Sequence, residues 1–112
     1  MDKRTLIQSI AKQNRSDPDS RHILWSRHAS VELINEGWTR HLIEDALVSC
    51  EVIEDYPTQH RPLPDCLVLG WLAETQPMHA VIAIDLLHNR LFVVTVYQPS
   101  PQEWKNDWRS RK

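Results

Sequence analysis

The chain has 112 residues, of which 41% are hydrophobic and 25% charged, an ordinary composition for one folded domain. Its formal net charge of −2 argues against a whole-protein attraction to nucleic acid or acidic membranes, so a polyanion site would have to be a local patch. No apolar stretch approaches the ~20 residues of a membrane span. Because the N-terminus also lacks a signal-peptide core, we expect a cytoplasmic protein that is not bound to a membrane, with Cys50 and Cys66 as free thiols.

The first half of the sequence predicts helices. Residues 2–14 have the apolar spacing of a short amphipathic helix, and the polar stretch 15–21, which contains a proline, predicts a linker. Ser26 is a suitable N-cap for a helix that Gly37 would end, and a second capped helix follows directly. The apolar stripe of this second helix is formed by Leu42, Ile43, Ala46 and Leu47. Residues 26–49 are therefore expected to form a helical hairpin.

The second half predicts strands. Four apolar segments have the length and composition of strands, at residues 51–56, 66–73, 78–86 and 91–97. Ser100, followed by a proline, predicts the start of a short C-terminal helix. We therefore expect an α+β fold with a four-stranded, mainly antiparallel sheet, the helical hairpin packed on one face and a short C-terminal helix. Residues 1–21 are predicted to be an added helix and linker, and residues 22–112 to be the single α+β domain.

The last two strands can be paired in detail. With an even sum of paired residue numbers, one face of this hairpin is wholly apolar and should lie under the helices. That face carries Ala80, Ile82, Ile84, Phe92, Val94 and Val96. The polar residues then gather on the opposite face, where His79 and Tyr97 lie near the end remote from the turn. An odd register would scatter them instead.

Arg27 and His28 follow the serine cap directly, where a helix normally favours acidic residues. The first backbone N–H groups of a helix have no intrahelical acceptor, and together with the helix dipole and a guanidinium they suit a phosphate or carboxylate. The dipole also favours a neutral imidazole that accepts a proton. The alternative is structural: Arg27 pairs with an acid of the sheet and His28 bonds a carbonyl.

Three further residues are candidates for chemistry, each with a structural alternative. His79 is predicted as catalytic or as a hydrogen-bonded strand residue, and Tyr97 as catalytic or as a packed ring with a tethered hydroxyl. Arg61, in a proline-rich loop, either reaches a ligand or is simply solvated. The histidines show no metal-ligand spacing and there is no CxxC pair, so we expect neither a metal nor a cofactor.

Several motifs together resemble a bacterial family. They are SRHA at the start of a helix, EVIEDYP, RP-x-P, PMHAVIAID and VVTVYQPSPQEW. In combination they resemble domain-of-unknown-function family 4258 over about residues 22–108, with Arg27, His28, His79 and Tyr97 on matching positions. Members of that family resemble distant relatives of the RelE/ParE toxin fold, and some are encoded beside small proteins that resemble antitoxins.

The resemblance implies an endoribonuclease toxin, ribosome-dependent or free, that a partner holds inactive. We therefore expect a toxin-like protein that binds RNA or cleaves it without a metal. His28 or His79 would be the base, Tyr97 or the other histidine the acid, and Arg27 or Arg61 the group that stabilises developing charge. RNA and an antitoxin-like protein are the expected partners of a monomer or weak dimer. The alternative is a non-enzymatic domain that binds a protein or a small anion.

Overall fold

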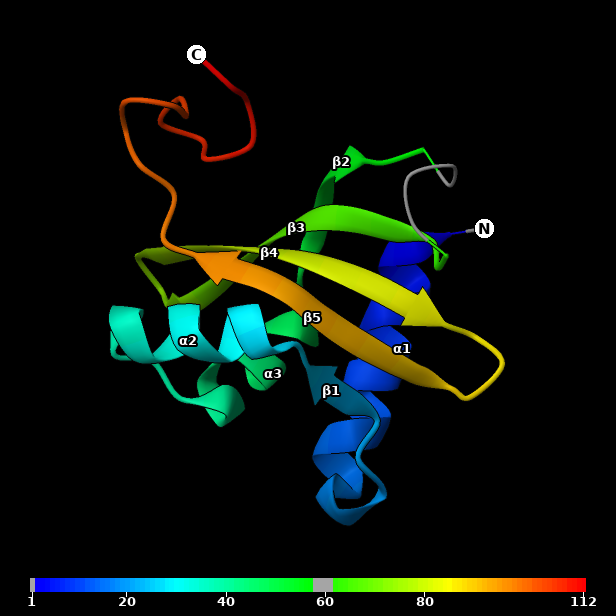
Figure 1. Cartoon of the computed structure of the whole chain (residues 1–112). Coiled ribbons are helices and arrows are strands. Elements are labelled where there is room, and N and C mark those ends of the chain that lie inside the picture. The colour runs from blue at the N-terminus through cyan, green and yellow to red at the C-terminus, as the bar shows by residue number, and fades with distance from the viewer. Residues whose placement is uncertain (1, 58–61) are drawn as a thin grey trace.

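The computed structural model describes residues 2–57 and 62–112. Helices and strands follow in the order α1 Lys3–Ser16, η1 Pro18–Ser20, β1 Ile23–Trp25, α2 Arg27–Glu36, α3 Arg40–Leu47, β2 Glu51–Asp55, β3 Asp65–Ala73, β4 Gln76–Asp85 and β5 Arg90–Tyr97 (Figure 1). The predicted caps are present, since Ser26 and Thr39 accept the amides of the third residue after each. Gly37 ends α2 in the left-handed conformation with φ +74°. No helix in the described residues is both long and apolar enough to cross a membrane.

The sheet has five strands in the order β1-β5-β4-β3-β2, rather than the four that the sequence predicted. The pairs β2–β3, β3–β4 and β4–β5 are antiparallel, as expected, and β1 adds to the outer edge of β5 in the parallel direction. The sequence analysis missed β1 because it is only three residues long and its partner lies more than sixty residues further along the chain. The fold is therefore α+β with a mixed sheet.

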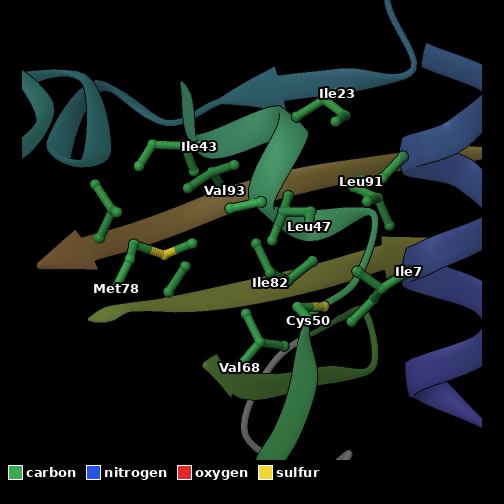
Figure 2. Close-up of a cluster of buried hydrophobic side chains, with 14 of the residues drawn as sticks. Ile7, Ile23, Ile43, Leu47, Cys50, Val68, Met78, Ile82, Leu91 and Val93 are labelled. Atoms are coloured by element: carbon green, nitrogen blue, oxygen red, sulfur yellow. The ribbon is translucent and has the colours of Figure 1, made fainter. Parts of the chain in front are cut away.

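All three helices contribute buried side chains to one face of the sheet, as predicted for the hairpin. Figure 2 shows Ile7 of α1 and Ile43 and Leu47 of α3 meeting side chains of the strands. α1 is thus part of the same core, with Ile7 0% and Ile10 2% exposed. The division of the chain near residue 21 stays a prediction.

The stripe predicted for α3 was partly wrong. Ile43 and Leu47 are fully buried and Ala46 is 6% exposed, but Leu42 is 37% exposed. Leu42 is turned toward the rim of the core, because the buried positions Ile43, Ala46 and Leu47 recur at the three- and four-residue spacing of one helix face. The helix therefore packs on the sheet through one narrow row of side chains.

The register of the last hairpin changes partway along. His79 pairs with Tyr97 and Val81 with Thr95, as the even register predicts, but Ile82 pairs with Val93. A bulge leaves Val94 as the extra residue, and from there to the turn the pairing is odd. Leu91 and Val93 therefore lie in the core in place of the predicted Phe92 and Val94, which are only half-buried.

The predicted C-terminal helix is absent, and the corresponding segment folds as a series of turns with one bridge, between Trp104 and Arg111. The carboxylate of Asp107 accepts hydrogen bonds from the amides of Arg109 and Ser110, a local arrangement that competes with a helix. Trp108 adopts φ +61°, which a helix would not allow. The backbone consequently turns back on itself.

This C-terminal segment covers part of the sheet face that the helices leave open. Trp104 is 2% exposed and forms a second apolar cluster with Leu67 and Val81, whose side chains lie opposite the main core. Tyr97 and Trp108 pack against the same cluster. The sheet is therefore covered on both faces, by helices on one side and by the C-terminal segment on part of the other (Figure 1).

Candidate functional site

Arg27 and His28 are the first two residues of α2, and both side chains are exposed. In the described part of the chain, Arg27 has no ion-pair partner, so the predicted structural bridge to an acid of the sheet is not seen there. The hydroxyl of Ser26 accepts the amide of Ala29 at 2.9 Å. The amides of Arg27 and His28 come before the first intrahelical bond and face outward. An arginine, an imidazole and the positive end of a helix thus meet at one surface point.

The imidazole of His28 is held by a carboxylate one helical turn further on. Its Nε2 lies 3.3 Å from Oε1 of Glu32, although 72% of the side chain of His28 is exposed. Because a carboxylate only accepts, Nε2 carries the proton in the neutral ring and Nδ1 keeps a lone pair. In that neutral form, Nδ1 of the exposed ring is left as a proton acceptor.

Glu32 is itself fixed by the end of β5. The same Oε1 accepts the amide of Val96 at 3.0 Å and the hydroxyl of Thr95. Glu36, one turn further along α2, accepts the amide of Gln98 at 2.6 Å. β1 ends before this part of β5, so the amides of Val96 and Gln98 have no strand to pair with on that side. The two glutamates accept their hydrogen bonds instead. The orientation of His28 is thereby tied to the sheet.

His79 lies on β4, where it is the register partner of Tyr97 of β5, and it is completely buried. Its Nε2 donates to the carbonyl of Trp108 at 2.7 Å, and its Nδ1 accepts from the hydroxyl of Tyr97 at 3.3 Å. Trp104 packs edge-on against the ring with the centroids 4.4 Å apart. Burial lowers the pKa of His79, which favours this neutral, doubly bonded form. Both ring nitrogens are occupied.

Tyr97 of β5 is the register partner of His79 and contacts its ring. It is half-buried, and burial raises the pKa of its hydroxyl, so the phenol stays protonated. Tyr97 and Thr95 are two residues apart on β5 and point to the same face, so Tyr97 is close to the Glu32 contact. A hollow of about 220 Å³ beside this contact is lined by Glu32, Glu36 and Tyr97, among others.

Two ion pairs hold the C-terminal segment over His79. Arg111 forms a two-point contact with Glu54, with Nε to Oε2 at 2.6 Å and Nη2 to Oε1 at 3.0 Å. Its guanidinium also lies 4.7 Å from the centre of the Trp104 ring. Arg109 forms a similar pair with Glu51, so the segment is attached to β2 at two points. His79 is buried because of this attachment.

Of the sequence candidates, the structure brings His79 into contact with Tyr97, while Arg27 and His28 are neighbours at the start of α2. His28 lies with Glu32, and His79 with Tyr97. Arg61 lies outside the described residues. The sequence analysis missed Glu32, although its position four residues after His28 on a helix was a usable signal. Among the described residues, no group of three His, Cys, Asp or Glu side chains is placed to hold a metal ion.

The family known as Domain of unknown function (DUF4258) matches residues 25–98. The chain belongs to this family. The match confirms the predicted family and includes Arg27, His28, His79 and Tyr97, while α1 and the C-terminal segment lie outside it. No curated protein and no solved structure was found to match this DUF4258 member. The relation to RelE/ParE toxins is not supported by these comparisons and stays a prediction.

Proposed function

We propose that this DUF4258 member binds RNA at the start of α2 and cleaves it there without a metal ion, as a toxin-like endoribonuclease. The observation that supports the proposal best is the exposed imidazole of His28, held by Glu32, with Arg27 beside it. The carboxylate of Glu32 is itself tied to the sheet by a backbone amide and a hydroxyl. Such positioning is what a general base requires.

The chemistry needs no group beyond the side chains described. Nδ1 of His28 takes the proton of the ribose 2′-hydroxyl, and the 2′-oxygen forms a bond to phosphorus. The bond from phosphorus to the 5′-oxygen breaks, which leaves a 2′,3′-cyclic phosphate and a free 5′-hydroxyl. Arg27 and the first amides of α2 hold the charge that develops on the phosphoryl oxygens. The protonated phenol of Tyr97 supplies the proton for the leaving oxygen and regains one from solvent.

His79 has a positioning role in this scheme. Its Nδ1 accepts from the hydroxyl of Tyr97, so it orients the phenol, while its burial keeps the imidazole away from substrate. This differs from the expectation in which either histidine could be the base. The assignment makes His28 the base and Tyr97 the acid.

A second function is favoured by a separate observation. Because both ring nitrogens of His79 are occupied, a reaction shared between two histidines is not available. A non-enzymatic domain that holds a phosphate or carboxylate requires only Arg27 and His28, and it needs neither His79 nor Tyr97. The two functions differ in whether the bound RNA is cut.

The test uses the full chain and an RNA oligomer labelled at its 5′-end. Incubation in EDTA, followed by a denaturing gel, should show products ending in a 2′,3′-cyclic phosphate. An oligomer of the same sequence with 2′-O-methyl riboses should bind without being cut. His28→Gln should lower the cleavage rate by ~10²–10⁴, the range for loss of a general base.

His41→Gln is the matched control, since His41 is an exposed histidine near the start of the neighbouring helix α3. It should cleave like the unchanged chain. Unchanged cleavage by the His28 variant would refute the proposed site. Binding of RNA without any cleavage, lost in Arg27→Ala, would instead establish the non-enzymatic function.

A further inference from the structure

The free edge of β1 exposes backbone groups that no strand pairs with in the described chain. The carbonyl of His22 accepts the amide of Leu91 at 2.7 Å, and the amide of Ser26 donates to the carbonyl of Val93 at 3.0 Å. In a parallel pair, alternate residues bond to the same neighbour, so His22, Leu24 and Ser26 face β5. The N–H and C=O groups of Ile23 and Trp25 therefore point away from the sheet.

This edge lies in a cleft of about 600 Å³ between the end of α1 and α3. The basic residues of the cleft are Arg21, Arg40 and His41, and its acidic residue is Glu44. Both oxygens of Glu44 are already used, one by Asn14 at 3.1 Å and one by the indole of Trp25 at 2.9 Å. The cleft therefore carries two guanidinium groups and one imidazole against one carboxylate, around an unpaired strand edge.

The two sides of the edge differ in character. Ile23 and Trp25 turn toward the helices, where the guanidinium of Arg40 lies 5.8 Å from the centre of the Trp25 ring. Leu24 alternates to the other face, beside its register partner Phe92. An added strand would place alternate side chains near the basic groups of α3 and near the apolar pair of Leu24 and Phe92.

We propose that β1 binds an extended, acidic segment of a partner protein, which adds to the sheet as a sixth strand in which acidic and apolar residues alternate. Backbone hydrogen bonds to Ile23 and Trp25 would hold the segment. The alternation of acidic and apolar side chains would give the specificity for this segment over other extended peptides. A second copy of this chain is disfavoured, because pairing β1 with itself would bring the basic groups of two copies of the cleft together. The site is separate from the chemistry proposed at His28 and does not depend on it.

The probe is an acetylated and amidated nonapeptide in which glutamate and valine alternate. Titrated into the ¹⁵N-labelled full chain, it should shift the amides of Ile23 and Trp25 and slow their hydrogen exchange. Two further forms are N-methylated, one at the central glutamates and one at the central valines. In a strand, these two residue types point their amides in opposite directions, so one methylated form should lose binding and the other should keep it.

Charge is tested separately with protein variants. Reversal at Arg21→Glu or Arg40→Glu should weaken the unmodified peptide about tenfold, whereas Lys105→Glu, an exposed lysine of the C-terminal segment, should have little effect. Equal binding of both methylated peptides would mean that charge alone attracts them, which overturns the added strand. Shifts of these amides by an oligoribonucleotide but not by the peptide would make the cleft a nucleic-acid site and overturn the proposal.

Discussion

Leu47→Ala is expected to destabilise the protein strongly. Leu47 is 0% exposed and lies at the centre of the main core, where Figure 2 shows it facing Val93 of β5 and Ile82 of β4. Leucine-to-alanine changes in such cores cost ~2–5 kcal/mol, because a cavity adds to the lost transfer energy. The neighbours of Leu47 belong to strands paired on both sides, so they have little freedom to close the cavity.

The expected change is large enough to measure by thermal unfolding. The entropy of unfolding is about 2.1 cal/mol/K per residue, or about 0.24 kcal/mol/K for 112 residues. A loss of ~3 kcal/mol should therefore lower the melting temperature by about 13 °C. Urea unfolding followed by circular dichroism should show the same loss in free energy with an unchanged slope against urea.

Leu42→Ala is the matched control, because it makes the same substitution on the same helix at a side chain that is 37% exposed. Its cost should stay below ~1 kcal/mol, partly offset by the higher helix propensity of alanine. Equal losses for the two variants would refute the packing of α3 described above. A larger loss at Leu42 would mean that α3 is rotated about its axis.

Three further outcomes are expected. Gly70→Ala should lower the free energy of unfolding in urea by ~1–3 kcal/mol, because the added Cβ would lie 2.9 Å from the end of the Met78 side chain and 3.2 Å from Ala46 of α3. An unchanged free energy of unfolding would contradict this close approach. The stability of the unchanged chain should fall as the pH drops below about 6.5, because the unfolded chain takes up a proton at His79 that burial keeps off the folded chain. The variant His79→Gln should lose that part of the dependence of stability on pH. An identical dependence in the variant would argue against the buried neutral ring. Arg111→Ala should speed amide hydrogen exchange within the C-terminal segment while changing the stability by no more than ~1 kcal/mol, and unaltered exchange would show that its pair with Glu54 does not hold the segment.

Local signals predicted the elements whose causes are local. Ser26 and Gly37 define the limits of α2 through side-chain capping and a left-handed residue, and both can be identified from neighbouring residues alone. The apolar runs of β3, β4 and β5 are likewise visible in sequence. The placement of His79 and Tyr97 on one face was also predicted, because both lie on the side of the bulge where the register is even.

The errors share a different physical origin. The bulge at Val94 inverts the alternation of β5, and no residue type at that position signals it. β1 is stabilised by a distant strand rather than by its own three residues. The burial of His79 involves Trp104 and Trp108 folding over it, a contact that the sequence analysis did not predict. The errors on β1 and on the burial of His79 concern contacts between segments far apart in sequence.

The C-terminal segment has a consequence for how this fold can vary. His79 lies inside the family match, but the carbonyl that occupies its Nε2 and the indole that covers its ring belong to residues after position 98. The reactivity of the imidazole is thus decided by an appendage outside the matched region. A chain with the same matched region and another ending would leave the Nε2–H of His79 without this carbonyl acceptor and its ring without the indole that covers it.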